Sequence, residues 1–351
     1  MRNDSLVIDP CSSTFLTMHR DEAILKEGVQ KFIVGSKFEF SPTLGGVNNI
    51  VKKVKVDDSD EYILRIYNNG DDSSKVTFEH LVLAELRKST MSFQLPAALL
   101  SIENGRTHEL ISDGSEASVF KLIPGTLPGI TCVTEIGKAC GELTKALSSV
   151  KVDYEPQTPP YFEIYKVHHA INRELFMREI HSPAFDEVRT SANVVAAEIT
   201  KIEHLVAQLL SLNLPQQLIH GDLHYDNVLV QDGKVTGVLD FEFCAWDWRA
   251  MDLAISLSKY ASEPNAMECF AQLIHGYAQF VTLTTVEIEA VADLVILRIL
   301  SNVVYFVGRA VAGEDSIDTL TSRIDAYVRR IDWLRAHKQD IIDCFVEPVD
   351  N

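Results

Sequence analysis

The sequence predicts an α+β fold with a β-rich N-terminal part and a mostly helical C-terminal part. Short strand-like runs, bounded by Gly, Asn and Asp, recur between residues 38 and 122. From residue 133 onward, apolar residues recur at three- and four-residue steps, as in amphipathic helices. Between these helices, two apolar runs at 228–230 and 235–239 flank Asp232-Gly233, a pair that favours a tight hairpin turn.

Composition narrows the classes of function. With 46% hydrophobic and 23% charged residues, the 351-residue chain resembles an ordinary globular protein that can bury a sizeable core. A net charge of −18 and the lack of a Lys/Arg cluster argue against nucleic acid as a partner, so we expect none. The six cysteines are scattered without a Cys-x-x-Cys pair, which disfavours a structural zinc site and a dense disulfide framework.

Neither the N-terminus nor the interior predicts a membrane partner. The first ten residues lack the apolar run of a signal peptide. The most apolar stretch, 291–311, predicts a core helix because polar residues interrupt it, namely Asp293, Arg298, Asn302 and Arg309. We therefore expect a cytoplasmic protein.

The N-terminal part predicts a sheet with two helices. Residues 21–33 and 75–86 have helical patterns, and the strand-like runs cover 38–44, 50–56, 62–67, 95–102, 107–111 and 117–122. The first three runs predict an antiparallel meander. Its first turn contains Gly45 and Gly46, which allow backbone N–H groups to approach phosphate oxygens closely.

The C-terminal part predicts a helical body. The expected helices cover 133–147, 161–180, 191–212, 246–260, a long segment after residue 284, and 317–334. Thr284 and Glu287 have the spacing of a capping box at the start of the long helix. We expect no metal at His168 and His169, because adjacent residues of a helix point to different faces and a third ligand is lacking.

The stretch 218–242 has the most specific chemistry. Asp222, Asn227 and Asp240 follow one another at fixed spacing, the last two at the two ends of the predicted hairpin. A carboxylate at Asp222 can accept the proton of an attacking hydroxyl, while Asn227 and Asp240 offer oxygen ligands to Mg²⁺. The alternative is a hairpin whose carboxylates cap turns or pair with arginines.

This His-x-Asp-x-x-x-x-Asn loop and the following Asp240-Phe241 resemble the catalytic core of the aminoglycoside phosphotransferase superfamily, a branch of the protein-kinase-like fold. Residues 240–254 are more narrowly similar to type II homoserine kinases. The resemblance covers about residues 35–345 and is specific at 218–254. It implies a two-lobed fold, with a nucleotide-binding N-lobe at 18–122, a catalytic and substrate-binding C-lobe at 123–351, and ATP between them.

The resemblance also implies a set of nucleotide contacts. Arg65 occupies the place where kinase-like folds usually have a phosphate-binding lysine, and an arginine fork can hold phosphate with a different geometry. Glu79 is the expected ion-pair partner of Arg65, with Glu85 as a competitor. Residues near the adenine ring would be Phe120, Lys121 and Ile123.

In the catalytic loop, the resemblance implies that Asp252 braces the backbone and that His220 is a structural anchor. The implied acceptor is a small amino alcohol or amino acid, best L-homoserine. Glu242 or Asp247 would then contact its ammonium group, although a structural salt bridge is an equal alternative for both acids. Other acceptors left open are an aminoglycoside, choline or hydroxylysine, and a catalytically silent kinase-like binding module is a further alternative. We expect a monomer or homodimer.

Overall fold

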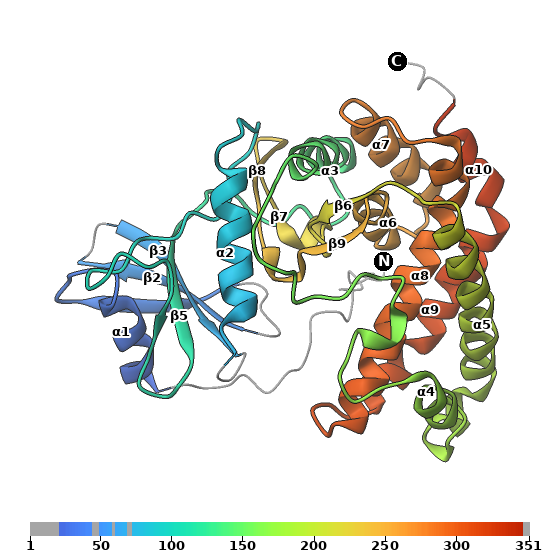
Figure 1. Cartoon of the computed structure of the whole chain (residues 1–351), viewed down its shortest axis with the longest axis horizontal. Coiled ribbons are helices and arrows are strands. Elements are labelled where there is room, and N and C mark those ends of the chain that lie inside the picture. The colour runs from blue at the N-terminus through green and yellow to red at the C-terminus, as the bar shows by residue number, and fades with distance from the viewer. Residues whose placement is uncertain (1–20, 44–48, 58–59, 69–71, 347–351) are drawn as a thin grey trace, which may run out of the picture. The chain divides into compact units, whose positions relative to one another are not determined.

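The computed structural model describes residues 21–43, 49–57, 60–68 and 72–346. The chain forms two compact units, one from Met1–His80 with Pro96–Ile123 and the other from Leu81–Leu95 with Pro124–Asn351 (Figure 1). Gly45 and Gly46, predicted to approach the nucleotide, lie outside the described residues. The nucleotide-binding and catalytic roles expected for the two parts stay predictions.

An antiparallel five-stranded sheet forms the first unit, in the order β1-β2-β3-β5-β4. The predicted meander is confirmed. The strand predicted at 95–102 is wrong, because only the isolated bridge of Ala98 with Phe120 forms there and Pro96 has no N–H to donate to a ladder. The strands are β1 (Phe38–Pro42), β2 (Ile50–Val56), β3 (Asp60–Tyr67), β4 (Glu109–Leu110) and β5 (Glu116–Lys121).

Helix α1 (Glu22–Gln30) covers one face of this sheet. The carboxylate of Asp21 accepts a hydrogen bond from the N–H of Ala23 and so caps the helix. Leu25 and Val29 are buried in one apolar cluster with strand residues such as Leu64. The second predicted helix, α2 (Ser74–Leu86), follows β3 along the chain.

Most of the second unit is helical (Figure 1). Two predicted boundaries are wrong: the helix expected at 161–180 begins only at Arg173, after the 3-10 turn η1 (Ile164–Lys166), and the helix expected at 246–260 begins at Met251. Helices α7 and α10 were not predicted. The helices are α3 (Val133–Leu147), α4 (Arg173–Ile180), α5 (Arg189–Ser211), α6 (Met251–Ser258), α7 (Ala266–Ala278), α8 (Thr285–Val311), α9 (Asp318–Ala336) and α10 (Lys338–Asp343), with a 3-10 turn η2 (Pro183–Val188).

Helix α8 is the long core helix that the sequence predicts. It begins with the expected capping box, in which Thr284 accepts from the N–H of Glu287 and the Glu287 carboxylate accepts from the N–H of Thr284. Its length and apolar composition would suffice to cross a membrane, but 78% of its most apolar window is buried inside the protein. That burial is the property of a core helix.

Two small sheets complete the second unit. Strands β7 (Val228–Gln231) and β8 (Lys234–Val238) form the predicted hairpin, and both turn residues, Asp232 and Gly233, have positive φ angles of 52° and 73°. Strand β6 (Gln216–Ile219) pairs with β9 (Ala245–Trp248). This pairing explains why residues 245–248 are extended although their apolar composition favours a helix.

Candidate active site

The loop that follows β6 has a fixed backbone. Gly221 has a φ of +80°, and a Cβ atom there would lie 2.2 Å from the carbonyl oxygen of Phe243. Only glycine therefore fits this position without a shift of the backbone. The hydroxyl of Tyr161 donates to the carbonyl oxygen of Gly221 at 2.8 Å. The close approach of Phe243 and the hydrogen bond from Tyr161 thus hold the loop in place.

Asp222 and Asn227 are in direct contact. The Asn227 Nδ2 donates to the backbone oxygen of Asp222 at 2.8 Å and to its Oδ2 at 3.0 Å. Because both donated bonds come from Nδ2, the other amide atom, Oδ1, points elsewhere, and it accepts no hydrogen bond from the described part of the chain. An amide oxygen in that state is a suitable ligand for a hard cation.

Asp240 lies at the exit of the hairpin, directly before the 3-10 turn η4 (Phe241–Phe243). Its backbone is left-handed, with φ 66° and ψ 67°, which is uncommon for a residue other than glycine. The preceding residue, Leu239, donates its N–H to the carbonyl oxygen of Asn227 at 2.8 Å. The backbone next to Asp240 is therefore bonded to Asn227, so the hairpin brings the two predicted metal ligands to one end.

Asp252 braces the loop through its backbone. Its Oδ2 accepts from the N–H of His220 at 2.9 Å, and its Oδ1 accepts from the N–H of Gly221 at 3.0 Å. The carboxylate is completely buried, and this burial raises its pKa to about 6 in spite of the two donors. The contact expected with His220 is present, but it goes to the backbone of that residue and not to its ring.

The His220 ring links the loop to the hairpin. Its Nδ1 accepts from the N–H of Asp222 at 3.2 Å, and its Nε2 lies 2.9 Å from the carbonyl oxygen of Leu239. Burial lowers the pKa of His220 to about 4, so the ring is neutral and its proton is on Nε2. Both ring nitrogens are thus engaged with the backbone, as the anchoring role predicted for His220 requires.

Sequence reasoning missed Arg298, which contacts Asp222 directly. Its Nη2 donates to Asp222 Oδ1 at 2.6 Å, and its Nη1 donates to Asn302 Oδ1 at 2.5 Å. The guanidinium carbon lies 5.5 Å from the centre of the Tyr161 ring. A positive charge inside an apolar helix is the signal that could have revealed this residue.

His224 also adjoins the carboxylate, with Nε2 3.4 Å from Asp222 Oδ2. Burial by itself would raise the pKa of Asp222, but His224, Arg298 and Lys259 together hold it below its usual range. The side chain of Asp222 is nevertheless 17% exposed. Asp222 is therefore an ionised carboxylate that a ligand can reach, which is the state a proton acceptor needs.

The two acids expected near a substrate ammonium group differ in position. Glu242 is half-buried in η4. Asp247 is fully buried, and its two oxygens accept from the N–H groups of Tyr161 at 2.5 Å and Trp248 at 2.6 Å. The predicted contact between Asp247 and a substrate is therefore wrong, because this carboxylate holds the segment of Tyr161 and is closed to solvent.

In the first unit, Arg65 and Glu79 form the expected ion pair. The Arg65 Nη1 lies 2.9 Å from Glu79 Oε1, and the two side chains are 11% and 2% exposed. The competitor Glu85 pairs with Lys88 instead. The role of Arg65 and Glu79 in binding a nucleotide stays a prediction. Of the residues predicted near adenine, Phe120 and Lys121 end β5 and Ile123 follows that strand. Phe120 and Ile123 are buried, and Lys121 is exposed.

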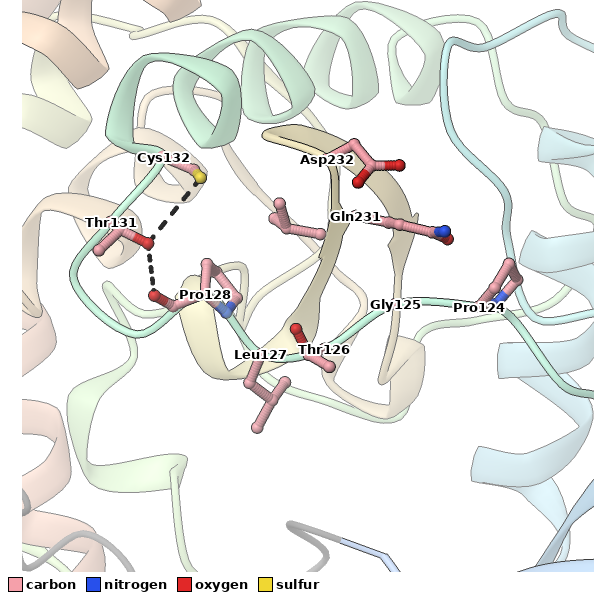
Figure 2. Close-up of a pocket in the computed structure, with 10 residues that line it drawn as sticks. Pro124, Gly125, Thr126, Leu127, Pro128, Thr131, Cys132, Gln231 and Asp232 are labelled. Atoms are coloured by element: carbon pink, nitrogen blue, oxygen red, sulfur yellow. Dashed lines mark hydrogen bonds between the residues drawn. The ribbon is translucent and has the colours of Figure 1, made fainter.

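A pocket of about 630 Å³ lies in the second unit between residues 124–132 and the hairpin (Figure 2). Thr126 exchanges backbone hydrogen bonds with Val230, and Thr131 Oγ1 donates to the carbonyl oxygen of Pro128. Gln231 and Asp232 form the opposite wall. None of the predicted site residues lines this pocket, so we assign it no catalytic role.

His168 and His169 lie in a loop and not in the predicted helix. The expectation that adjacent helix residues point to different faces therefore does not apply to them. Glu314 provides the third group that the sequence did not indicate, and the three can place ligand atoms within 4.8 Å of one another. However, Arg309 Nη1 lies 3.2 Å from the same Glu314 carboxylate. A cation bound there would be repelled by this guanidinium.

Comparison with known proteins places this geometry in a family. The phosphotransferase enzyme family matches residues 39–288. The chain belongs to that family. A homoserine kinase of Methylocella silvestris is 25% identical over 239 residues, which cover 66% of this chain and 69% of that protein. The phosphotransferase assignment and the kinase-like fold expected from the sequence are thus confirmed.

Solved structures of small-molecule kinases have the same fold. The microcompartment-associated aminopropanol kinase superposes with a TM-score of 0.65 at 16% identity, covering 92% of this chain and all of that one. Amicoumacin kinase, in complex with AMP-PNP and Ca²⁺, has a TM-score of 0.64 at 18% identity, covering 94% and 96%. At these identities the likeness concerns the fold alone.

Proposed function

We propose that this phosphotransferase transfers the γ-phosphoryl group of ATP to the hydroxyl of L-homoserine and releases O-phospho-L-homoserine and ADP. The observation that carries the proposal is the contact between Asn227 Nδ2 and Asp222 Oδ2 at 3.0 Å. It fixes a solvent-accessible carboxylate beside an amide whose oxygen is turned away from it. A proton acceptor and a metal ligand thus sit side by side, as phosphoryl transfer needs.

Asp222 is the proposed acceptor of the hydroxyl proton. Its position is fixed by three neighbours, since Asn227 and Arg298 contact its oxygens and His220 accepts from its N–H. Because such transition states are loose, we expect orientation of the hydroxyl to contribute more to the rate than removal of its proton. Replacing Asp222 by Asn should lower turnover by about 10²- to 10⁴-fold.

ATP and Mg²⁺ are the proposed cofactors. The donor set fits a hard cation, because Asn227 Oδ1 is directed away from Asp222 and Asp240 supplies a carboxylate at the same end of the hairpin. The ion would neutralise charge on the phosphate oxygens when bound. Arg65, held by Glu79, is the proposed phosphate contact in the first unit, with Phe120, Lys121 and Ile123 near the adenine ring.

Homoserine is the proposed acceptor for two reasons. The curated relative with 66% coverage of this chain is named a homoserine kinase, and the motif at 240–254 is similar to that group. Glu242, half-buried next to Asp240, is the proposed partner of the ammonium group. We propose a cytoplasmic location, because ATP is the co-substrate. An amino alcohol is the alternative acceptor, since an aminopropanol kinase has the same fold.

An acceptor screen tests this function. ADP release would be followed with homoserine, hydroxylysine, choline, methylthioribose and aminoglycosides, with Asp222→Asn as the blank. We expect homoserine to give the highest kcat/KM. Turnover restricted to an antibiotic or to choline would overturn the homoserine assignment. Silence with every acceptor would favour a kinase-like binding module without activity.

A further inference from the structure

We propose that Arg298 binds the carboxylate of the acceptor and thereby makes the enzyme select hydroxy amino acids over amino alcohols. This inference rests on the proposed function and names the residue that sets its substrate class. Arg298 lies on α8, and its guanidinium touches the carboxylate proposed to receive the acceptor hydroxyl. A substrate bound at Asp222 therefore meets this cation.

Neighbouring side chains hold the guanidinium of Arg298 in a defined position. All eighteen residues from Ala290 to Val307, Arg298 among them, are buried or half-buried. Arg298 carries a charge there, as does Asp293, which Arg335 and Lys338 neutralise. The Arg298 side chain is 15% exposed, and Asn302 and the Tyr161 ring hold the guanidinium. Placing a cation in an apolar helix is costly unless it is paired. Asp222 supplies this pairing, so the charge lies at the carboxylate where the acceptor hydroxyl is proposed to bind.

The chemistry of a guanidinium indicates which acceptor group it binds. Arginine has a planar fork of N–H donors that matches a carboxylate, and it stays charged at every physiological pH. An amino alcohol such as choline or aminopropanol carries a hydroxyl and a cationic group but no carboxylate, so it offers Arg298 no anionic partner. Homoserine carries a hydroxyl, an ammonium and a carboxylate. Asp222, Glu242 and Arg298 are a complementary set of partners for these three groups.

The rival explanation is that Arg298 only orients Asp222 and keeps it ionised. The two roles predict different patterns across substrates. An orienting residue affects all acceptors alike, because each of them uses Asp222. A carboxylate-binding residue affects only acceptors that have a carboxylate, and mainly through KM. The comparison of one substrate with and without its carboxylate therefore separates the two roles.

The experiment measures kcat and KM for L-homoserine and for 3-aminopropan-1-ol, which is homoserine without its carboxylate. The proteins are the wild type, Arg298→Gln, Arg298→Lys and, as a matched control on α8, Arg309→Gln. We expect wild type to prefer homoserine by about 100-fold in kcat/KM, as for one charge-assisted hydrogen bond. Arg298→Gln should abolish that preference, mostly by raising KM for homoserine, and Arg298→Lys should restore part of it.

A second readout does not depend on turnover. Calorimetric titration of homoserine should show a similar loss of affinity, about 100-fold, in Arg298→Gln and none in Arg309→Gln. Circular dichroism would verify that each variant is folded. Equal losses for both acceptors, or a wild type that phosphorylates 3-aminopropan-1-ol as well as homoserine, would overturn the inference while the phosphotransfer stands. A wild type inactive on both acceptors would refute the proposed function and the inference together.

Discussion

Two buried carboxylates of the candidate active site, Asp247 and Asp252, bind backbone in the same way. Each accepts two backbone N–H groups, Asp247 from the segments of Tyr161 and Trp248 and Asp252 from the catalytic loop. Burial raises the pKa of Asp247 to about 7 and that of Asp252 to about 6. Asp252 thus fixes the loop that precedes Asp222, whereas Asp247 fixes the segments of Tyr161 and Trp248.

The raised pKa of Asp247 makes stability depend on pH. Because the folded protein holds this proton more tightly than the unfolded chain, whose carboxyl has a pKa of 3.8, the group favours folding in acid. Its contribution is lost as the pH rises from about 4 through 7. We therefore expect the free energy of unfolding to fall from pH 5 to pH 8 less steeply in Asp247→Asn than in wild type.

Urea denaturation at four pH values between 5 and 8 measures these slopes. The exposed loop residue Asp153 provides the control, since Asp153→Asn should leave the slope of the wild type unchanged. Parallel slopes for wild type and Asp247→Asn would contradict the assignment of the titration to this carboxylate.

At the level of elements, glycine allows α3 and α7 to pack backbone against backbone. A Cβ atom on Gly137 would lie 2.2 Å from the carbonyl oxygen of Leu273, and one on Gly276 would lie 2.3 Å from that of Thr134. Such distances leave no room for a methyl group. The packing of α3 against α7 therefore depends on small residues. Helix α3 also contacts α6, which carries Asp252.

Gly137→Ala tests this packing. Alanine in a helix interior ordinarily stabilises by about 1 kcal/mol relative to glycine. Here the methyl group would push α3 away from α7, so we expect a net loss of about 3 kcal/mol in the free energy of unfolding, measured by urea denaturation. Gly129→Ala is the control, because a Cβ atom added there would have no other atom within 4 Å. Only the backbone angle φ of +58° would be strained, at a cost of about 1 kcal/mol. A Gly137→Ala variant as stable as wild type would refute the close packing.

The sequence predicts an element when the interactions that form it join residues close together in the chain. The β7–β8 hairpin and the capping box of α8 arise from neighbouring residues, so Asp232-Gly233 and Thr284 with Glu287 predict them. Strand β9 depends on β6, which is distant in the chain, and local composition suggests a helix there. Arg298 is 76 residues from Asp222. No spacing rule connects them, so only the fold brings the pair together.

At the level of the whole molecule, the second unit contains all three residues proposed for proton acceptance and metal binding. Hydrogen bonds within the loop and hairpin connect Asp222, Asn227 and the backbone next to Asp240. The central claim is that this loop and hairpin perform phosphoryl transfer. Asp240 is the residue to test, because its proposed role as a metal ligand rests on its position and its chemistry.

The most direct test is the Mg²⁺-dependent kcat of Asp240→Asn with homoserine and ATP, compared with Asp232→Asn at the hairpin turn. We predict that Asp240→Asn stays folded, with an unchanged urea midpoint, and loses about three orders of magnitude in kcat, as expected when a metal loses a carboxylate ligand. Asp232→Asn should retain wild-type kcat. A folded Asp240→Asn enzyme with near-normal turnover would contradict the account.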